Sequence, residues 1–436
     1  MHYIEKEGED HVKKKLLMLL CVCMVLGGCS DAGSVKPSEA EEPSVQETQG
    51  SQEKPVLVEG DEQEIQQVEL TDAYQKAAYF VDQVYDETTG NVLVSPLSLN
   101  VALGMATEGA SGETAKELYR YLGREDYADW VDEYMSYAEG LSASGNGNSG
   151  YTFNYKLANS IWVKQDEKLL SDYQMLVKKQ FRATAENVDF VGDAEKTAQK
   201  INSWCDKQTE GLIKEVVDPS MFSKELMAIL VNSVYFESPW KNAWNLKSHE
   251  FIDLHGNKKE REMLSDMLDT YYENEYATAF SKSYYNGFQF IGILPKAEGD
   301  FELSDLDLKS LLESKTNEYD VSAIMPQLNY ETKTEAVIDV LKAQGVCRAF
   351  DENSAEFFRM IEGEPLFISK IIQKCKIELD KDGTRAAAVT AILMAKGSAM
   401  ELKEKKIKEV FLDRPFAFLI YDSQRDQIVF AGKVVE

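Results

Sequence analysis

Apolar residues recur at helical spacing where the folded part of the chain begins. Within 70–87 they are three or four positions apart, which favours an α-helix with one apolar face: Leu70, Ala73, Ala77, Phe80, Val81 and Val84. Thr71 and Asp72 are good N-cap residues, so we expect them to cap this helix. A short apolar strand is expected over 92–94. The next stretch, 97–108, is apolar nearly all round, which predicts a buried helix behind a sheet.

Helical and strand-like patterns then follow one another without a fixed repeat. We expect helices over 193–208 and 334–344, and strands over 228–236, 288–294, 368–379 and 416–421. Because strands and helices do not alternate regularly, the pattern favours an α+β fold over a doubly wound parallel sheet. With 436 residues, 44% of them hydrophobic, the chain can bury a large core.

The N-terminal region has the pattern of a secretory leader. Lys13, Lys14 and Lys15 precede an apolar run over 16–25, and small residues stand before Cys29. The run is shorter than the ~20 apolar residues that span a bilayer, so we expect 1–28 to be a cleaved leader. Leu26-Gly27-Gly28-Cys29 resembles the bacterial lipobox, which predicts a lipid anchor on Cys29. An ordinary signal peptide that ends at an unmodified Cys29 is the alternative.

Residues 29–66 are predicted to be an acidic, disordered tether. From 30 to 66 there are ten acidic residues, two lysines, three prolines and no aromatic residue, which is too little apolar surface for a core. We therefore expect one folded domain over 67–436. The formal net charge of -28 argues against nucleic acid as a partner, because phosphate binding needs clustered Lys and Arg.

Few residues are available for catalysis or for a metal ion. After the leader the chain has two histidines, His249 and His255. They are six positions apart in a stretch that looks extended, hence about 20 Å apart and too far to share a metal. GxSxG, HExxH and phosphate-loop motifs are absent, so we predict no enzyme activity, cofactor or metal site. Three further cysteines are expected to be buried free thiols: Cys205, Cys347 and Cys375.

Several motifs follow a definite order from residue 91 to the end of the chain. They are Asn91-Val-Leu-Val-Ser95-Pro96-Leu-Ser98, Gly109-Ala-Ser-Gly112-Glu-Thr114, Ile201-Asn202-Ser-Trp204, Thr209-Glu-Gly211, Leu230-Val-Asn232-Ser-Val-Tyr235-Phe236 with Trp240, Met325-Pro326, Ile368-Ser369-Lys370, Gly383-Thr384 and Asp413-Arg414-Pro415-Phe416. Each motif is weak alone, but their order and spacing resemble the serpin family. The resemblance implies the serpin fold, which is an α+β domain with a large central mixed sheet backed by helices, smaller further sheets, and an exposed reactive loop, here about 381–406.

The resemblance also implies a mechanism, which is suicide-substrate trapping. In the family, a protease attacks one bond of the reactive loop, here called the bait bond, and forms an acyl-enzyme. The cut loop then inserts into the main sheet as a new strand before water releases the enzyme. The expected function is therefore inhibition of a serine protease, or also a cysteine protease. The alternative is a non-inhibitory surface protein with the serpin fold that binds a partner without trapping it.

The residues from Gly383 onward suit such an inserted strand. Successive side chains of a strand face opposite sides, and counting from Thr384 the inward set is small or apolar: Thr384, Ala386, Ala388, Thr390 and Ile392. The resemblance marks the hinge of the loop as Gly383, Thr384, Ala386, Ala387, Ala388 and Thr390. There is no proline over 384–406, so no strand hydrogen bond is lost to proline. An alanine-rich helix is the alternative, which the β-branched residues at 389, 390 and 392 disfavour.

Two ways of counting place the bait bond differently. In the family it follows the fourteenth residue from the hinge threonine, which gives Gly397–Ser398, whereas counting back from Pro415 makes the arm over 399–406 several residues too long. We prefer the first count, because the sheet fixes the length of the inserted strand. The neighbouring candidates stay open: Lys396, Ala395, Met394 and Met400. Glycine, alanine or methionine would suit elastase-like or subtilisin-like proteases, and lysine a trypsin-like one.

The resemblance assigns a further group of residues to the region of the main sheet that must open: Ser95, Ser98, Asn232, Trp240 and Gln373. Gln373 stands where most members have histidine, and it can still hydrogen-bond to Asn232 or Ser95. Lys381 and Gln327 stand where the family commonly has an acid and a lysine. That family ion pair is therefore not expected.

Some serpins bind sulfated sugars through a basic helix. The matching region, 126–140, contains five acidic residues and no Lys or Arg, so we expect no polyanion activator. Its aromatic residues fall at helical spacing and are expected to join the core: Trp130, Tyr134 and Tyr137. The expected protein is a monomer at the bacterial cell surface, held by the lipid on Cys29, or else secreted.

Overall fold

The structure, a computed structural model, describes residues 70, 72–86, 90–148, 153–363, 366–384 and 405–436, with the backbone alone over 142–148. The helices are α1 (Ala73–Val84), α2 (Pro96–Gly109), α3 (Gly112–Leu122), α4 (Tyr127–Asn148), α5 (Ser171–Gln180), α6 (Ala194–Gln208), α7 (Leu308–Glu313) and α8 (Val337–Ala343), with 3-10 turns η1 (Pro219–Met221), η2 (Leu303–Leu306) and η3 (Arg348–Phe350). None of these helices is both long and apolar enough to cross a membrane.

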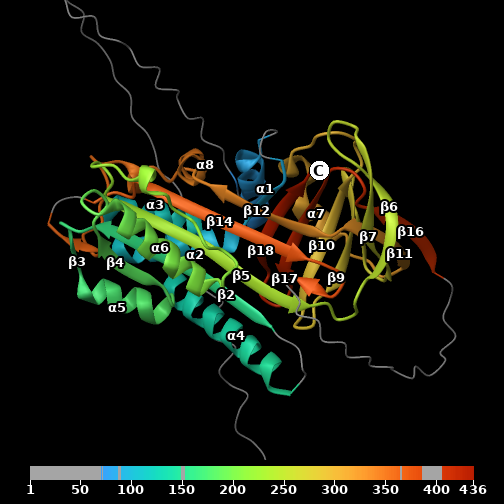
Figure 1. Ribbon diagram of the computed structural model, residues 1–436, viewed down its shortest axis with the longest axis horizontal. Helices are drawn as coiled ribbons and strands as arrows, with labels where there is room; N and C mark the ends of the chain where they lie inside the picture. Colours follow the sequence, from blue (N-terminus) through green and yellow to red (C-terminus); the bar gives the residue numbers. More distant parts are fainter. Residues whose placement is uncertain (1–69, 71, 87–89, 149–152, 364–365, 385–404) are drawn as a thin grey trace, which may run out of the picture. The chain divides into compact units, whose positions relative to one another are not determined.

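The central sheet is six-stranded and mixed (Figure 1). In spatial order its strands are β12 (Leu328–Thr334), β14 (Lys370–Leu379), β15 (Gly383–Thr384), β5 (Ala228–Pro239), β2 (Asn154–Lys164) and β4 (Thr184–Val188). Alternate residues of β5 enter two separate cores. Leu230 and Val234 pack with α2 in the larger core, and Ile229 and Val231 pack with α6 in the smaller one. Because both faces of β5 are covered, nearly all of its residues are buried, the polar Asn232 and Ser233 among them.

Two further sheets lie together beside the central one (Figure 1). The six-stranded sheet has the order β1 (Val92–Val94), β18 (Gln427–Val434), β17 (Phe416–Asp422), β10 (Phe288–Pro295), β9 (Ala277–Ser283) and β8 (Tyr271–Glu273). The four-stranded sheet has the order β16 (Lys406–Phe411), β11 (Tyr319–Pro326), β7 (Lys258–Leu268) and β6 (Asn245–Ile252). A small ribbon pairs β13 (Ile361–Glu362) with β3 (Lys168–Leu169).

The predicted α+β class is confirmed, and so are most of the predicted elements. The helix expected over 70–87 is α1, and the carboxylate of Asp72 accepts a hydrogen bond of 2.9 Å from the backbone N–H of Gln75. The strand predictions correspond to β1, β5, β10, β14 and β17. One helix starts later than predicted, because Thr334 pairs with Gln373 as the last residue of β12. That helix, α8, begins at Val337.

Candidate functional site

The candidate site is the boundary between the parallel strands β14 and β5, which we call the seam. The two strands pair directly from Lys370 opposite Ile229 to Lys374 opposite Ser233. Toward the other end of the seam, β15 lies between them and pairs with β5, with Thr384 opposite Ser238. Thr384 is also opposite Leu379 of β14. The first two residues of the predicted hinge therefore already form a strand inside the central sheet.

The side chain of Thr384 points into the protein. It is 3% exposed, and its hydroxyl shares a hydrogen bond of 2.7 Å with the hydroxyl of Tyr284. The ring of Tyr284 stacks on that of Trp240, with 4.1 Å between the ring centroids. Burial raises the pKa of Tyr284 well above its ordinary value, so the phenol stays neutral. Thr384 thus has the inward orientation that the strand alternation predicts for it.

A tight turn after β14 holds β15 in place. The Asp380 carboxylate accepts hydrogen bonds from the backbone N–H groups of Asp382 (2.8 Å) and Gly383 (3.1 Å). The indole N–H of Trp240 donates to the Asp380 carbonyl at 2.9 Å, and its backbone N–H donates to the Asp382 carbonyl at 3.0 Å. Trp244 donates its backbone N–H to the Lys381 carbonyl at 2.9 Å. Trp240 therefore contacts the turn twice and supports Thr384 through Tyr284.

A buried polar network crosses the other end of the seam. Gln373 of β14 accepts a hydrogen bond from the Ser95 backbone N–H (2.8 Å) and donates to the Ser95 carbonyl (3.0 Å) and to the side-chain oxygen of Asn232 on β5 (2.5 Å). Asn232 donates to the Ser98 hydroxyl and to the Asn159 side chain, both at 2.6 Å. All five residues are buried. The predicted hydrogen bonding of Gln373 to Ser95 and Asn232 is confirmed.

Lys381 and Gln327 each bond to a different partner. The ammonium of Lys381 pairs with Asp382 at 2.7 Å, while the Gln327 amide donates to the Glu262 carbonyl at 3.5 Å. The turn and the neighbouring β12–β11 junction are thus held by contacts other than the family's acid–lysine pair.

The rest of the predicted loop lies outside the described residues. This holds for the later hinge positions and for all candidates for the bait bond: Ala386, Ala387, Ala388, Thr390, Met394, Ala395, Lys396, Gly397, Ser398 and Met400. The structure resumes at Lys405, directly before β16, which pairs in parallel with β11. The two ends of the loop are therefore fixed in different sheets, with β15 in the central sheet and β16 in the four-stranded one.

An ionic cluster attaches β16 to β8 of the six-stranded sheet. The ammonium of Lys408 lies 3.1 Å from the Glu273 carboxylate and over the rings of Tyr271 and Tyr319. Glu273 also accepts a hydrogen bond of 2.8 Å from the Tyr271 hydroxyl and pairs with Lys296 at 3.1 Å. The hydrogen bond from Tyr271, helped by the two lysines, lowers the pKa of Glu273 to about 2. The carboxylate is therefore charged throughout the neutral range.

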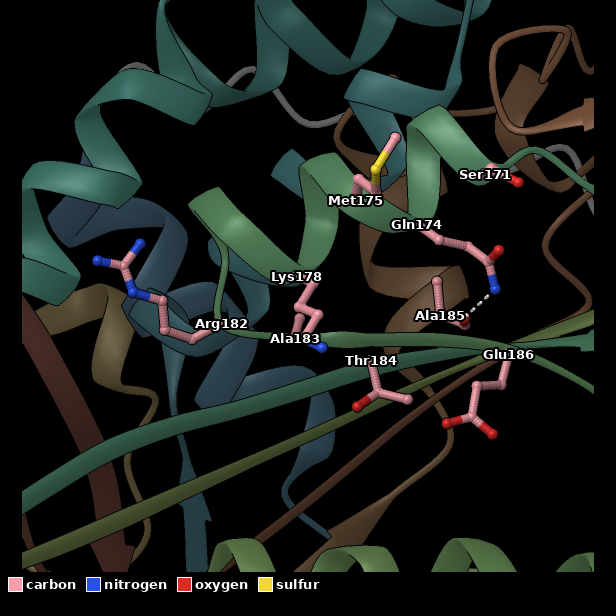
Figure 2. Close-up of a pocket in the computed structure, with 9 residues that line it drawn as sticks. All are labelled: Ser171, Gln174, Met175, Lys178, Arg182, Ala183, Thr184, Ala185 and Glu186. Atoms are coloured by element: carbon pink, nitrogen blue, oxygen red, sulfur yellow. Dashed lines mark hydrogen bonds between the residues drawn. The ribbon is translucent and has the colours of Figure 1, made fainter.

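A hollow of about 630 Å³ lies between α5 and β4, the edge strand of the central sheet (Figure 2). Gln174 reaches across it and donates a hydrogen bond of 3.0 Å to the Ala185 carbonyl. Arg182 turns its guanidinium away toward Asp132 and Glu139 of α4. The lining residues all come from α5, β4 and their connection, so this hollow is separate from the candidate site.

The predictions for histidine and cysteine are partly wrong. His249 lies on β6 with its Nε2 2.9 Å from an oxygen of Asp413, but His255 lies in the turn after that strand, so 248–255 is not extended throughout. Cys205 and Cys375 are buried free thiols as expected, whereas Cys347 is exposed at the start of η3. Over the described residues there is no group of three or more His, Cys, Asp or Glu side chains suited to a metal.

The aromatic residues of α4 join the core, as predicted. Tyr134 is buried, and Trp130 and Tyr137 pack against the same core. Sequence reasoning missed Tyr284, Asp380 and Trp244, which hold the hinge. Tyr284 is 100 residues from its partner Thr384, and a single tyrosine on a strand carries no local signal of such a contact. The short Asp380–Gly383 turn is the one feature with a signal, since Asp followed by Gly favours turns.

Comparisons with known proteins identify the family. A model of the serpin (serine protease inhibitor) family matches residues 75–436. An uncharacterized serpin-like protein of Thermococcus kodakarensis is 32% identical over 370 residues, which cover 82% of this chain and 84% of that protein. The leukocyte elastase inhibitor of Xenopus tropicalis is 29% identical over 364 residues, covering 80% of this chain and 93% of that protein.

Solved structures agree with this assignment. The crystal structure of the thermophilic serpin tengpin in its native state matches with a TM-score of 0.70 at 25% identity and covers 85% of this chain and 97% of tengpin. Native protease nexin-1, solved with heparin, matches in fold with a TM-score of 0.66. The chain therefore belongs to the serpin family, whose members are mostly protease inhibitors rather than enzymes, and it has the serpin fold.

Proposed function

We propose that this protein inhibits a serine protease, or also a cysteine protease, by suicide-substrate trapping with insertion of the cut loop into the central sheet. The main support for the proposal is that β15 already lies in the central sheet. Gly383 and Thr384 already pair with β5 inside the sheet, and the Thr384 side chain points inward. A strand that continues from Thr384 would place Ala386, Ala388 and Thr390 on the same inward side, where small side chains fit.

The proposed bait bond is Gly397–Ser398, with Lys396, Ala395, Met394 and Met400 as neighbouring candidates. Among the similar proteins, one is named as an inhibitor of leukocyte elastase, which supports an elastase-like target. We propose elastase-like or subtilisin-like enzymes first and trypsin-like enzymes through Lys396 second. Neither nucleic acid nor a sulfated polyanion is proposed as a partner, because the chain is strongly acidic and α4 has no Lys or Arg over 127–140.

The test is to mix the purified protein with pancreatic elastase, subtilisin and trypsin. Trapping gives a complex that survives hot detergent and releases a C-terminal peptide, whose mass locates the bait bond. A matched pair of variants separates trapping from ordinary cleavage. Ala386→Arg puts a charge on the inward side and should turn the inhibitor into a substrate, whereas Ala387→Arg faces solvent and should leave trapping intact. Clean cleavage without a complex by every enzyme tried would favour a serpin-fold binding protein that does not trap.

We also propose that the protein is a monomeric surface lipoprotein, with leader 1–28, an acidic tether over 29–66, and a lipid on Cys29. Lipid attached through Cys29 would hold the serpin domain at the membrane. Cys29→Ser should move the protein from the detergent phase to the aqueous phase in detergent partitioning. Cys347→Ser is the matched control, because that cysteine is exposed in the folded domain. Equal partitioning of Cys29→Ser and the unaltered chain would exclude the anchor.

A further inference from the structure

A nearly buried carboxylate on β5 has only neutral hydrogen-bond donors around it in the described part of the chain. Glu237 is 8% exposed. Its Oε2 accepts hydrogen bonds from the side-chain amide of Asn154 (2.7 Å) and from the hydroxyl of Tyr235 (2.8 Å). Among the described residues it forms no ion pair. Because a carboxylate is costly to bury without a compensating charge, this position favours a cation.

A second carboxylate lies across the seam from Glu237. Glu378 of β14 is partly exposed and pairs with Lys376 of the same strand at 2.7 Å. Its neighbour Leu379 belongs to the larger core, so Glu378 points to the other side of the sheet. Glu237 points to that same side, since its neighbour Phe236 also belongs to the larger core. The two acids therefore share one face of the central sheet and stand on opposite sides of the seam.

The register of β15 leads to the space between these two acids. Thr384 is opposite Ser238 of β5 and opposite Leu379 of β14. Both pairings are antiparallel, so the next position along the strand would be opposite Glu237 on one side and Glu378 on the other. Neighbouring strands are about 4.8 Å apart, which places both carboxylates within reach of one long side chain at that position.

The residue that follows Thr384 in the sequence is Arg385, which is the only charged residue over 384–395. It lies outside the described residues. As the neighbour of the inward-facing Thr384, it would face outward in a strand that continues from β15. A guanidinium is always charged and carries five N–H donors in a planar fork, so it can bond to two carboxylates at once. Sequence and register thus bring a cation to the place where β5 and β14 each offer an acid.

We propose that Glu237 and Glu378 form a two-carboxylate site that holds the Arg385 guanidinium when a strand continues from Thr384. This inference rests on the proposed function, because that strand is the cut loop of the inhibitor. The site would fix the strand register, since a slip of one residue would turn Arg385 toward the core and reverse every other side chain. The two acids are then positioning residues that favour insertion over release of the cut chain by water. They would not change the attack on the bait bond, which lies much farther along the loop.

The test is a double-mutant cycle of Arg385→Gln and Glu237→Gln, each of which removes a charge and keeps a similar shape. With the faster of elastase and subtilisin, the ratio of trapped to cut chain should fall about five- to tenfold in either single variant, as expected for the loss of a charge-assisted hydrogen bond. The double variant should fall little further, because the same interaction is lost only once. The second-order rate constant for attack should not change. Trypsin is avoided, because it can also cut after Arg385.

Two further variants separate this interaction from a general effect of charge. Glu186→Gln is the matched control, because Glu186 is an acid of the same sheet but lies on the edge strand β4, where it pairs with Lys200 at 2.6 Å. It should leave the ratio of trapped to cut chain unchanged. Arg385→Lys keeps the charge and should retain most of the trapping.

Three results would overturn the inference. An unchanged ratio in Glu237→Gln shows that insertion does not use this carboxylate. Losses that simply add in the double variant show that Glu237 acts through Asn154 and Tyr235 instead of Arg385. A loss in Arg385→Lys as large as that in Arg385→Gln shows that the charge is not what the two acids recognise.

The proposed function can fail separately from this inference. If the unaltered chain is cut without forming a complex, trapping is excluded, yet the melting temperature of the chain cut between 394 and 400 still tests the site. Arg385→Gln and Glu237→Gln should then each lower that temperature, by amounts that do not add in the double variant. A cut chain that melts at the temperature of the uncut one contradicts both, because no strand then continues from Thr384.

Discussion

The hydrogen bond between the hydroxyls of Thr384 and Tyr284 should contribute measurably to the stability of the hinge. Tyr284→Phe would leave this buried hydroxyl without the 2.7 Å hydrogen bond it makes now, at a cost of about 1–3 kcal/mol. We expect urea unfolding, followed by tryptophan fluorescence, to show a free energy of unfolding lower by that amount. Trp240 stacks on Tyr284 and makes the signal sensitive to this region.

The double variant Tyr284→Phe/Thr384→Val supplies the control. Replacing both partners leaves no unsatisfied group, so it should cost less than the two single substitutions together. Strictly additive effects would show that the hydrogen bond between the two hydroxyls contributes nothing to the position of the hinge.

Gln373 is the residue on which the network across the seam depends. Gln373→Met removes three hydrogen bonds and leaves the Ser95 backbone groups and the Asn232 side chain buried without these partners. We expect a loss of about 3–5 kcal/mol in the free energy of unfolding. Gln327→Met is the matched control, because Gln327 is exposed and makes one long hydrogen bond of 3.5 Å. Equal losses for the two variants would contradict this role for Gln373.

For single residues, the sequence predicts contacts between residues that belong to the recognised motifs. It does not predict contacts between residues outside those motifs that pack together from different sheets. The hydrogen bonding of Gln373 follows from its polar groups and its place among Ser95 and Asn232. The contact between Tyr284 and Thr384 does not follow, because it depends on how β9 and its following turn pack under β15. Periodicity shows which face a residue occupies and does not show what covers that face.

If the loop inserts as proposed, strand β16 is the element that would keep an uncut loop out of the central sheet. The uncut loop stays joined to β16, so full insertion must pull β16 away from β11 and break the contacts of Lys408 with Glu273, Tyr271 and Tyr319. We expect Glu273→Gln to increase, by up to about fivefold, the rate at which the warmed, uncut protein loses inhibitory capacity, since partly exposed ion pairs contribute up to about 1 kcal/mol. Residual inhibition of the target protease measures this loss.

Acid should affect the unaltered chain and the Glu273→Gln variant differently. The pKa of Glu273 is lowered from 4.5 to about 2, so its stabilising effect is complete above pH 4.5 and disappears as the pH falls toward 2. The rate at which the warmed, uncut protein loses inhibitory capacity should therefore become more similar for Glu273→Gln and for the unaltered chain as the pH falls over that range. Glu250→Gln is the control, because Glu250 pairs with Lys258 between β6 and β7 and does not hold β16. A difference that persists at pH 2 would contradict the ionic explanation.

Elements with a strong apolar pattern are predicted well, and those fixed by a neighbour are not. Helix α2 and strand β5 are rich in apolar residues because they are covered on all sides, and both were predictable. The start of α8 was not, since Thr334 could serve either element until its pairing with Gln373 in β12 is known. Likewise nothing in the local pattern distinguishes exposed Cys347 from buried Cys205.

At the scale of the whole molecule, the proposed insertion would have to separate β14 from β5, which pair directly over the short stretch from Lys370 to Lys374. After cleavage, a strand that continues from Thr384 would be hydrogen-bonded on both sides and would bury Ala386, Ala388 and Thr390. Since the inserted strand adds ladder hydrogen bonds and buried apolar surface, the cut protein should melt at a clearly higher temperature than the uncut one.

Limited cleavage followed by thermal unfolding measures this effect without any need to know the natural target. Ala387→Arg, which faces solvent in the inserted strand, should show the same rise in Tm on cleavage. Ala386→Arg should show little or none, because its guanidinium would have to be buried without a partner for the strand to continue past Thr384. If all three proteins keep their original Tm after a cut between 394 and 400, the sheet does not accept the loop. The two residues of β15 would then be a fixed edge of the fold instead of the start of an inserted strand.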